Sequence, residues 1–233
     1  MKEKIIPATI LALGIVILGL CLKSGIDNFV NKDRQVTVKG LSEQDVEADR
    51  VTWPIVSKEI GNDLPELYSK IAQKEQTIKN FLLKNGVKEE EITINPPRVI
   101  DMNANEYSEQ NKRYRYNITS IITVVSSNVK VVRGIIARQG ELLKDGIAIL
   151  ENGYENSISY EFVDFPAMKP KMMQEAIANA QKTAEQFAVN SNSKINKIIK
   201  ADQGQFSIEN RDSNTPHIKR VRVVTTVTYS LKN

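Results

Sequence analysis

The stretch KMMQEAIANAQKTAEQFAVN, residues 171–190, decides the fold more than any other part of the chain. Its apolar residues recur three and four positions apart, which predicts an amphipathic helix over residues 168–190. The predicted apolar stripe consists of Met172, Met173, Ala176, Ile177, Ala180, Ala184, Phe187 and Ala188. Because alanine is so common in this stripe, the helix can approach a sheet closely, and we expect the two to share a core.

Two strands, residues 194–209 and 217–231, are expected to follow this helix and to close the chain. In the second strand apolar and polar residues alternate, so that alternate side chains point to opposite faces. The expected buried face carries Val221, Val223, Val227 and Tyr229.

The first half of the chain repeats this order of elements. A helix is predicted over residues 63–86, where Asp63 and Glu66 form a capping box and Gly86 ends the helix. Its expected apolar face is formed by Leu64, Leu67, Tyr68, Ile71, Ile78, Phe81 and Leu82. An extended segment precedes it over residues 46–61, and Pro54 within that segment predicts a sheet edge or a bulge.

Further strands are expected over residues 91–100, interrupted by Pro96 and Pro97, and from Arg113 onward, with a polar loop at 101–111 between them. A helix over residues 128–144 should then bury Val132, Ile135, Ile136 and Leu143. A strand or strand pair is expected over residues 147–163, with Asn152-Gly153 as its turn.

Strand, helix, strand, strand therefore occurs twice, around the helices at 63–86 and 168–190. We interpret this as a duplication within an α+β fold, in which helices pack on antiparallel sheets. About 200 residues are available, enough for one large domain or for two small, intimately packed ones.

The N-terminal run from Ile5 to Leu22 is uncharged and follows Lys2 and Lys4 directly. As a helix it would extend about 27 Å, close to the roughly 30 Å hydrocarbon core of a bilayer. Basic residues ahead of it favour a cytoplasmic N-terminus. We therefore expect a single-pass inner-membrane anchor at 1–24, a linker at 25–35 and a periplasmic domain at 36–233.

Two alternatives to an uncleaved anchor stay open. A cleaved signal peptide calls for small residues at the cleavage site, and none of that pattern occurs at Leu22, Lys23 and Ser24. A lipoprotein would carry its lipid on Cys21, although Leu20 stands where that pattern requires a small residue.

Three motifs of the second half carry a resemblance to a known family: EAIANAQKTAEQFA at 175–188, KADQGQFSIEN at 200–210 and KRVRVVTTVTYSL at 219–231. Weaker matches lie at 36–53 and 113–129. The chain resembles the SIMPL-domain family of bacterial periplasmic or envelope proteins, long classed as a domain of unknown function. The resemblance implies an α+β domain, an envelope location and, in some relatives, ring-like oligomers. It supplies no catalytic residues.

Residues with catalytic or ligand-binding chemistry are scarce. His217 is the single histidine and Cys21 the single cysteine, so neither a zinc-ligand set nor a nucleophile–histidine pair can be assembled from them. The Glu89–Glu91 run reads as a solvated turn, and Gly204 lacks any phosphate-binding motif around it. We therefore predict no enzyme activity and no catalytic, cofactor or metal site. The net charge of +4 is dispersed along the chain, which argues against nucleic acid as a partner.

Four arginines form the candidate binding patch. Arg220 and Arg222 should project from the last strand, and Arg113 and Arg115 from their own strand. If the two strands are neighbours, the arginines make a cationic surface for an anionic ligand or an acidic partner. The alternative is a solvated sheet face with carboxylates nearby.

The sequence thus favours a non-enzymatic, membrane-anchored envelope protein that acts as an interaction or assembly module and forms homo-oligomers. The alternative is a periplasmic domain that binds a small anionic ligand or a peptide.

Overall fold

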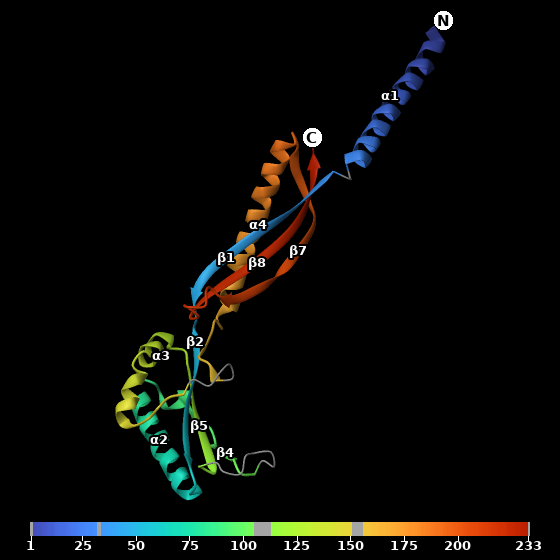
Figure 1. Ribbon diagram of the computed structural model, residues 1–233. Helices are drawn as coiled ribbons and strands as arrows, with labels where there is room; N and C mark the ends of the chain where they lie inside the picture. The colour runs from blue at the N-terminus through green and yellow to red at the C-terminus, as the bar shows by residue number, and fades with distance from the viewer. Residues whose placement is uncertain (1, 32–33, 105–112, 151–155, 233) are drawn as a thin grey trace. The chain divides into compact units, whose positions relative to one another are not determined.

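A computed structural model describes residues 2–31, 34–104, 113–150 and 156–232, without the side chains of 2–11 and 27–31 (Figure 1). The predicted turn at Asn152-Gly153 and most of the predicted loop at 101–111 lie outside these residues. The chain divides into two compact units. Unit 1 comprises Met1–Gln44, Pro166–Ile208 and Val221–Asn233, and unit 2 comprises Asp45–Phe165 and Glu209–Arg220.

Helix α1 (Lys2–Asn31) begins the chain. It continues through most of the predicted linker at 25–35, so that this segment is largely helical. The segment contains no proline, and its one glycine, Gly25, costs a helix only about 1 kcal/mol. Searching the described residues reveals no helix with the length and apolar character of a membrane span. The predicted anchor starts at Ile5, and the side chains of its first residues are outside the described set.

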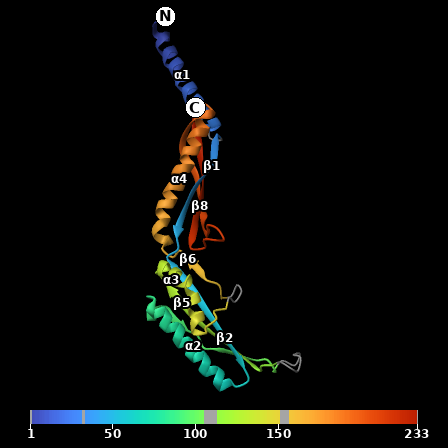
Figure 2. The same ribbon diagram turned by 60° about the vertical axis from the view of Figure 1, so that its left-hand side comes forward.

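Unit 1 is built around a three-stranded sheet in the order β1-β8-β7. Its elements are β1 (Gln35–Glu47), α4 (Phe165–Asn190), β7 (Lys194–Asn210) and β8 (Ile218–Lys232). The amide of Leu231 donates to the Arg34 carbonyl over 2.9 Å, so the end of β8 lies beside the start of β1 and the two strands are antiparallel. Helix α4 runs along one face of this sheet (Figure 2).

The α4 helix confirms the predicted alanine-rich stripe, but in a narrower form. Met172, Ala176, Ala180, Ala184 and Ala188 are buried, and they follow one another at intervals of four residues. By contrast Ile177 and Phe187, which were assigned to the stripe, are 40% and 60% exposed. Each is about 100° away from the buried row around the helix axis, and the narrow sheet covers only that row.

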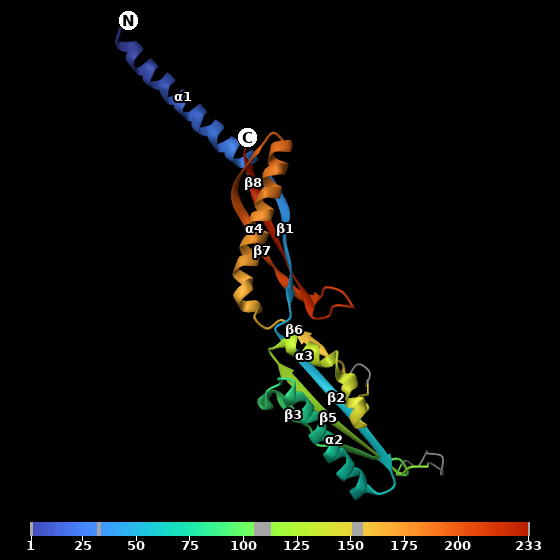
Figure 3. The same cartoon turned by 90° about the vertical axis from the view of Figure 1, so that its left-hand side faces the viewer.

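Unit 2 carries the second sheet, with strand order β3-β5-β2-β6 and with β4 also paired to β5. Its elements are β2 (Arg50–Gly61), α2 (Leu64–Lys84), the 3-10 helix η1 (Glu89–Glu91), β3 (Ile92–Ile94), β4 (Arg98–Asp101), β5 (Tyr116–Ser126), α3 (Val129–Ile136), the 3-10 helix η2 (Gln139–Asp145) and β6 (Ser159–Glu161). Both α2 and α3 pack on the β2–β5 pair (Figure 3). Trp53 and Ile122 are the central side chains of that core, each 1% exposed.

The ends of α2 confirm the cap at Asp63 and the end at Gly86, but the Glu66 side chain pairs with Lys70 instead of completing the predicted capping box. The Glu66 amide donates to the Asp63 carboxylate over 2.9 Å, and Gly86 adopts a positive φ of 96° just after the helix. The predicted helix at 128–144 is instead broken into α3 and η2. The tighter 3-10 turn buries Leu142 and leaves Leu143 63% exposed, which is the reverse of the expectation.

Prolines mark irregular places in the second sheet, as predicted. Pro54 pairs with Thr123 of β5, while on its other side β2 is paired with β6 only over Arg50–Thr52. Around Pro96 and Pro97 the register shifts by one residue, because Ile94 pairs with Ile122 whereas Arg98 pairs with Thr119. This shift is a bulge that separates β3 from β4.

The two units share one connectivity. With β6 left aside, the first strand of each unit pairs with the last, and the intervening strand or strands lie on the other side of that last strand, which gives β1-β8-β7 and β2-β5-β3/β4. The expected first strand of the second repeat, residues 147–163, does not take that place. Its only described strand, β6, is three residues long and pairs with β2, and β1 supplies the repeat instead. The predicted domain at 36–233 therefore consists of two units.

Candidate functional site

Two of the four candidate arginines project from β8. Arg222 is exposed and Arg220 half-buried, on the face opposite the buried Val221 and Val223, as predicted. Arg220 Nε lies 3.1 Å from an Asp45 carboxylate oxygen, and Arg222 Nε lies 3.9 Å from one of Glu43. Both carboxylates belong to β1, the neighbouring strand, so the positive charge of this face is balanced locally.

The other two arginines precede β5 rather than lying on it, because that strand begins at Tyr116. Arg115 donates from Nε and Nη2 to the Asp101 carboxylate over 3.0 and 2.9 Å, which lowers the pKa of Asp101. The Arg113 guanidinium lies 5.4 Å from the centre of the Tyr114 ring. Strands β5 and β8 belong to different sheets, so the condition for one cationic patch is not met.

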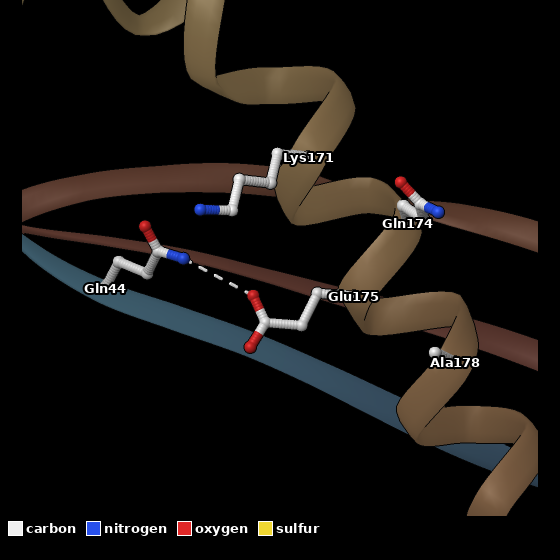
Figure 4. Close-up of a pocket in the computed structure, with 5 residues that line it drawn as sticks. All are labelled: Gln44, Lys171, Gln174, Glu175 and Ala178. Carbon is white, nitrogen blue, oxygen red and sulfur yellow. Dashed lines mark hydrogen bonds between the residues drawn. The ribbon is translucent and has the colours of Figure 1, made fainter.

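A polar hollow lies where α4 passes over the end of β1 (Figure 4). It has a volume of about 370 Å³ and is lined by Gln44, Lys171, Gln174, Glu175 and Ala178. The Glu175 carboxylate accepts hydrogen bonds from Ser42 Oγ over 2.9 Å and from Gln44 Nε2 over 3.4 Å. These contacts hold α4 in place on β1, as does the bond from Asn179 Nδ2 to the Leu41 carbonyl at 2.8 Å.

The sequence reading missed this polar contact, although a signal for it exists. Ser42 continues the alternation of Val36, Val38 and Gly40 along β1, so it occupies an inward position, and it is 1% exposed. A polar residue at a buried position of a strand requires a hydrogen-bond partner. Glu175 provides that partner from the facing helix.

The single histidine lies in a contact between β6 and the start of β8. Its ring meets the Tyr160 ring edge-on, with centroids 6.1 Å apart. Burial lowers the pKa of His217, and the nearby charge of Arg133 lowers it further. Among the described residues no three potential ligands gather in a way that could hold a metal ion.

The remaining residues considered for chemistry have structural roles. Glu89 accepts a 2.7 Å hydrogen bond from Lys79, which lowers the pKa of Glu89, and Glu91 accepts one of 2.6 Å from Ser126. Gly204 of β7 lies against the backbone of β8, and a Cβ atom there would stand 1.9 Å from the Val224 carbonyl oxygen. Close backbone packing thus accounts for this glycine.

An apolar hollow of about 300 Å³ opens at the start of α2. Its walls are Leu64, Pro65, Tyr68, Val99 and Ile118. Ile118 forms a fully buried floor, while Tyr68 and Val99 on the rim are 60% and 46% exposed. The predicted place of Tyr68 on the buried face of α2 is therefore wrong, since the side chain lies on this exposed rim.

Strand β7 presents the longest sheet edge among the described strands. It has 17 residues and stands last in the order β1-β8-β7. Most of its side chains are exposed. From 201 to 208 it carries one charged residue, Asp202, which is 2.9 Å from Lys200. A long edge with few charges is open to pairing with a further strand.

Comparison with protein families settles the relationship. The model of SIMPL, described as a protein of unknown function (DUF541), matches residues 36–229. The chain belongs to the SIMPL family. This match extends across both units, so the SIMPL domain includes the two repeats together. A comparison with curated proteins finds no match.

Proposed function

We propose that this SIMPL protein is a non-enzymatic module of the cell envelope, anchored in the inner membrane with its domain in the periplasm, and that it assembles with further copies of itself. The observation that carries the proposal is the outer edge of β7 between residues 201 and 208, which is defined here as the assembly edge. The anchor rests on the uncharged run from Ile5 to Leu22.

The assembly edge offers a row of backbone donors and acceptors to a partner strand. Competing edges are less suited to this role. Strands β3, β4 and β6 are short, with three, four and three residues. Strand β1 is longer, but its C-terminal half carries Glu43, Asp45 and Glu47. Charged side chains on a strand edge discourage pairing, and Asp202 is the one charged residue of the assembly edge.

Confinement to a membrane would strengthen such an edge contact. Anchored copies move in two dimensions, so their effective concentration is raised and modest interfaces close into a symmetric assembly. A ring requires that the edge of one copy meet a different surface of the next. The family resemblance, which implies rings in some relatives, agrees with this arrangement.

Site-directed crosslinking of the full-length protein in membranes tests the assembly edge. In a Cys21→Ser background, Gln205→Cys labelled with a maleimide-benzophenone photocrosslinker, which can join each copy to a different surface of the next, should give a ladder of bands above the dimer. Gln181→Cys, an exposed glutamine on α4, is the matched control and should remain monomeric. The double variant Ala201→Lys, Gln203→Lys should lose the ladder while keeping its melting temperature. A monomer band alone from Gln205→Cys, or equal ladders at both positions, would refute the assembly edge.

The anchor has its own test. An alkaline phosphatase fused to the C-terminus should be active, and the protein should resist extraction from membranes at alkaline pH. An inactive fusion, or a mature N-terminus near Ser24, would contradict a single-pass anchor with an external domain.

A second candidate function, peptide binding, is favoured by the apolar hollow at Leu64, Tyr68 and Val99. The hollow adjoins β4, which is paired with β5 on one side and has no strand on the other within the described residues. An extended peptide could add to β4 and place an apolar side chain in the hollow. The peptide acetyl-Leu-Phe-Leu-amide should shift the methyl resonances of Val99 and Ile118, and Tyr68→Lys should abolish the shift. Leu143→Lys, at an exposed leucine elsewhere, serves as control; shifts that persist in Tyr68→Lys would argue against the site.

A further inference from the structure

One end of unit 1 is joined to α1 by a short length of chain. Helix α1 ends at Asn31 and β1 begins at Gln35, so the two are separated by about 14 Å of extended chain at most. The Arg34 side chain donates to Ser193 Oγ over 2.8 Å, and the Lys197 amide donates to Ser230 Oγ over 3.1 Å. The start of β1, the end of β8 and the start of β7 therefore lie together. We call this part, with the last turn of α4, the tethered end of unit 1 (Figure 1).

The tethered end exposes large apolar side chains. On α4, Phe187 and Val189 are 60% and 72% exposed, and on β7, Ile198 and Ile199 are 55% and 52% exposed. Ile198 adjoins Lys197, whose amide contacts Ser230, so it is level with the end of β8. None of the four belongs to the core cluster of Val38, Ala184 and Tyr229 beneath them. A concentration of exposed apolar groups marks a surface that contacts another apolar phase.

Basic residues accompany these apolar side chains. Lys182, Lys194, Lys197, Lys200 and Lys232 are exposed at or near the tethered end. The carboxylates among them are Glu185 and Asp202, and the latter is paired with Lys200 at 2.9 Å. Apolar groups bordered by lysines suit the boundary between lipid headgroups and acyl chains, where the apolar groups insert and the lysines meet anionic lipid.

We infer that the tethered end of unit 1 docks on the surface of the bilayer, inserting Phe187, Val189 and the two isoleucines at headgroup depth. The inference rests on the proposed anchor, because α1 is what brings this end to the membrane. It assigns the N-terminal part of β7 to lipid, whereas the assembly edge at residues 201–208 serves protein partners.

Fluorescence of the full-length protein in vesicles tests the docking. The vesicles contain phosphatidylcholine and phosphatidylglycerol at about three to one, with or without bromine on the acyl chains. Phe187→Trp is compared with Tyr68→Trp in unit 2, since both native side chains are 60% exposed. The native Trp53 is 1% exposed and contributes the same background to both variants. We expect at least twofold greater quenching by brominated lipid in Phe187→Trp, and a blue-shifted emission.

A charge-reversal variant tests the role of the lysines, and each possible failure refutes a different claim. Adding Lys194→Glu and Lys197→Glu to Phe187→Trp should reduce the quenching by half or more, because anionic lipid then repels the end. A protein that fails to float with the vesicles refutes the anchor itself. A protein that floats but shows equal quenching in the Phe187→Trp and Tyr68→Trp variants refutes the docking alone. A blue shift already present in detergent, together with crosslinked dimers at this end, would assign the surface to a second copy and overturn the inference.

Discussion

Gly40 of β1 lies against Ala176 of α4 so closely that a Cβ atom on the glycine would stand 1.9 Å from the alanine's carbonyl oxygen. The same atom would be 2.8 Å from the Cβ atom of Ala180. Backbone therefore packs on backbone at this point, and the small residues of α4 and β1 are a matched set. The flanking bonds from Ser42 to Glu175 and from Asn179 to Leu41 keep the helix in this register.

Replacing Gly40 should be severely destabilising. Gly40→Ala forces α4 away from β1, and we expect a loss of about 3 kcal/mol or more in the free energy of unfolding, at the upper end of overpacking effects. Gly134→Ala on α3 is the control, since a Cβ atom there meets nothing within 4 Å. It should stabilise by about 0.5 to 1 kcal/mol through helix propensity. Urea unfolding measures both; a neutral Gly40→Ala variant would show that the contact is not tight in solution.

The buried row of α4 predicts a second contrast. Ala180→Glu places a carboxylate against Val38 and Val227, and several kcal/mol should be lost because the charge has no partner. Ala178→Glu, two residues away on the exposed side, should change stability by less than about 0.5 kcal/mol. Expression yield and thermal melting compare the two variants, and equal melting temperatures would mean that the buried face has been assigned wrongly.

Ser42→Ala tests the polar contact between β1 and α4. Removing the hydroxyl should cost about 1 kcal/mol, since Glu175 loses a charge-assisted partner but keeps access to water. Thr37→Ala, also on β1, removes an exposed hydrogen bond to Thr228 of β8 and should have a smaller effect on the free energy of unfolding. If the Ser42→Ala, Glu175→Gln double variant loses the sum of the two single effects, the residues are not coupled.

His217 predicts a pH dependence near neutrality. Its lowered pKa means that the folded protein binds fewer protons than the unfolded chain between the folded pKa and the ordinary value of about 6.5. The free energy of unfolding should therefore fall as the pH decreases through this window. Since the chain has one histidine, His217→Gln should flatten the profile just below about pH 6.5. The negative charges of Glu47 and Asp212 raise the pKa of His217 and so oppose part of this lowering. Identical profiles for both proteins would contradict the prediction.

Local features were predictable because local rules determine them. The cap at Asp63, the alanine row of α4 and the interruption of the strand at Pro96 and Pro97 each depend on residues a few positions apart. The pairing of β1 with β8 depends on residues almost the whole chain apart, and strand alternation alone does not specify a partner. For that reason the sequence places the strand at 147–163 in the wrong repeat and leaves open whether β5 and β8 are neighbours.

The candidate site shows the same division. The outward direction of Arg220 and Arg222 follows from alternation, and it was predicted. Their carboxylate partners on β1 depend on which strands are neighbours, as does the absence of one shared patch with Arg115. The exposure of Tyr68 and Phe187 was missed because periodicity gives the direction of a side chain and not the width of the sheet that covers it.

The interleaved course of the chain has a consequence for biosynthesis. β1 is made before almost all of unit 2, yet its partner β8 is among the last residues to be made. Closing so long a loop is slow, whereas most of unit 2 is one continuous segment, Asp45–Phe165, whose elements lie much closer together in the sequence. On a growing chain unit 2 should thus form first, while Val36 and Val38 remain uncovered. A protein stopped before Ile218 would leave β1 permanently without its partner strand, a species for proteases and chaperones to remove.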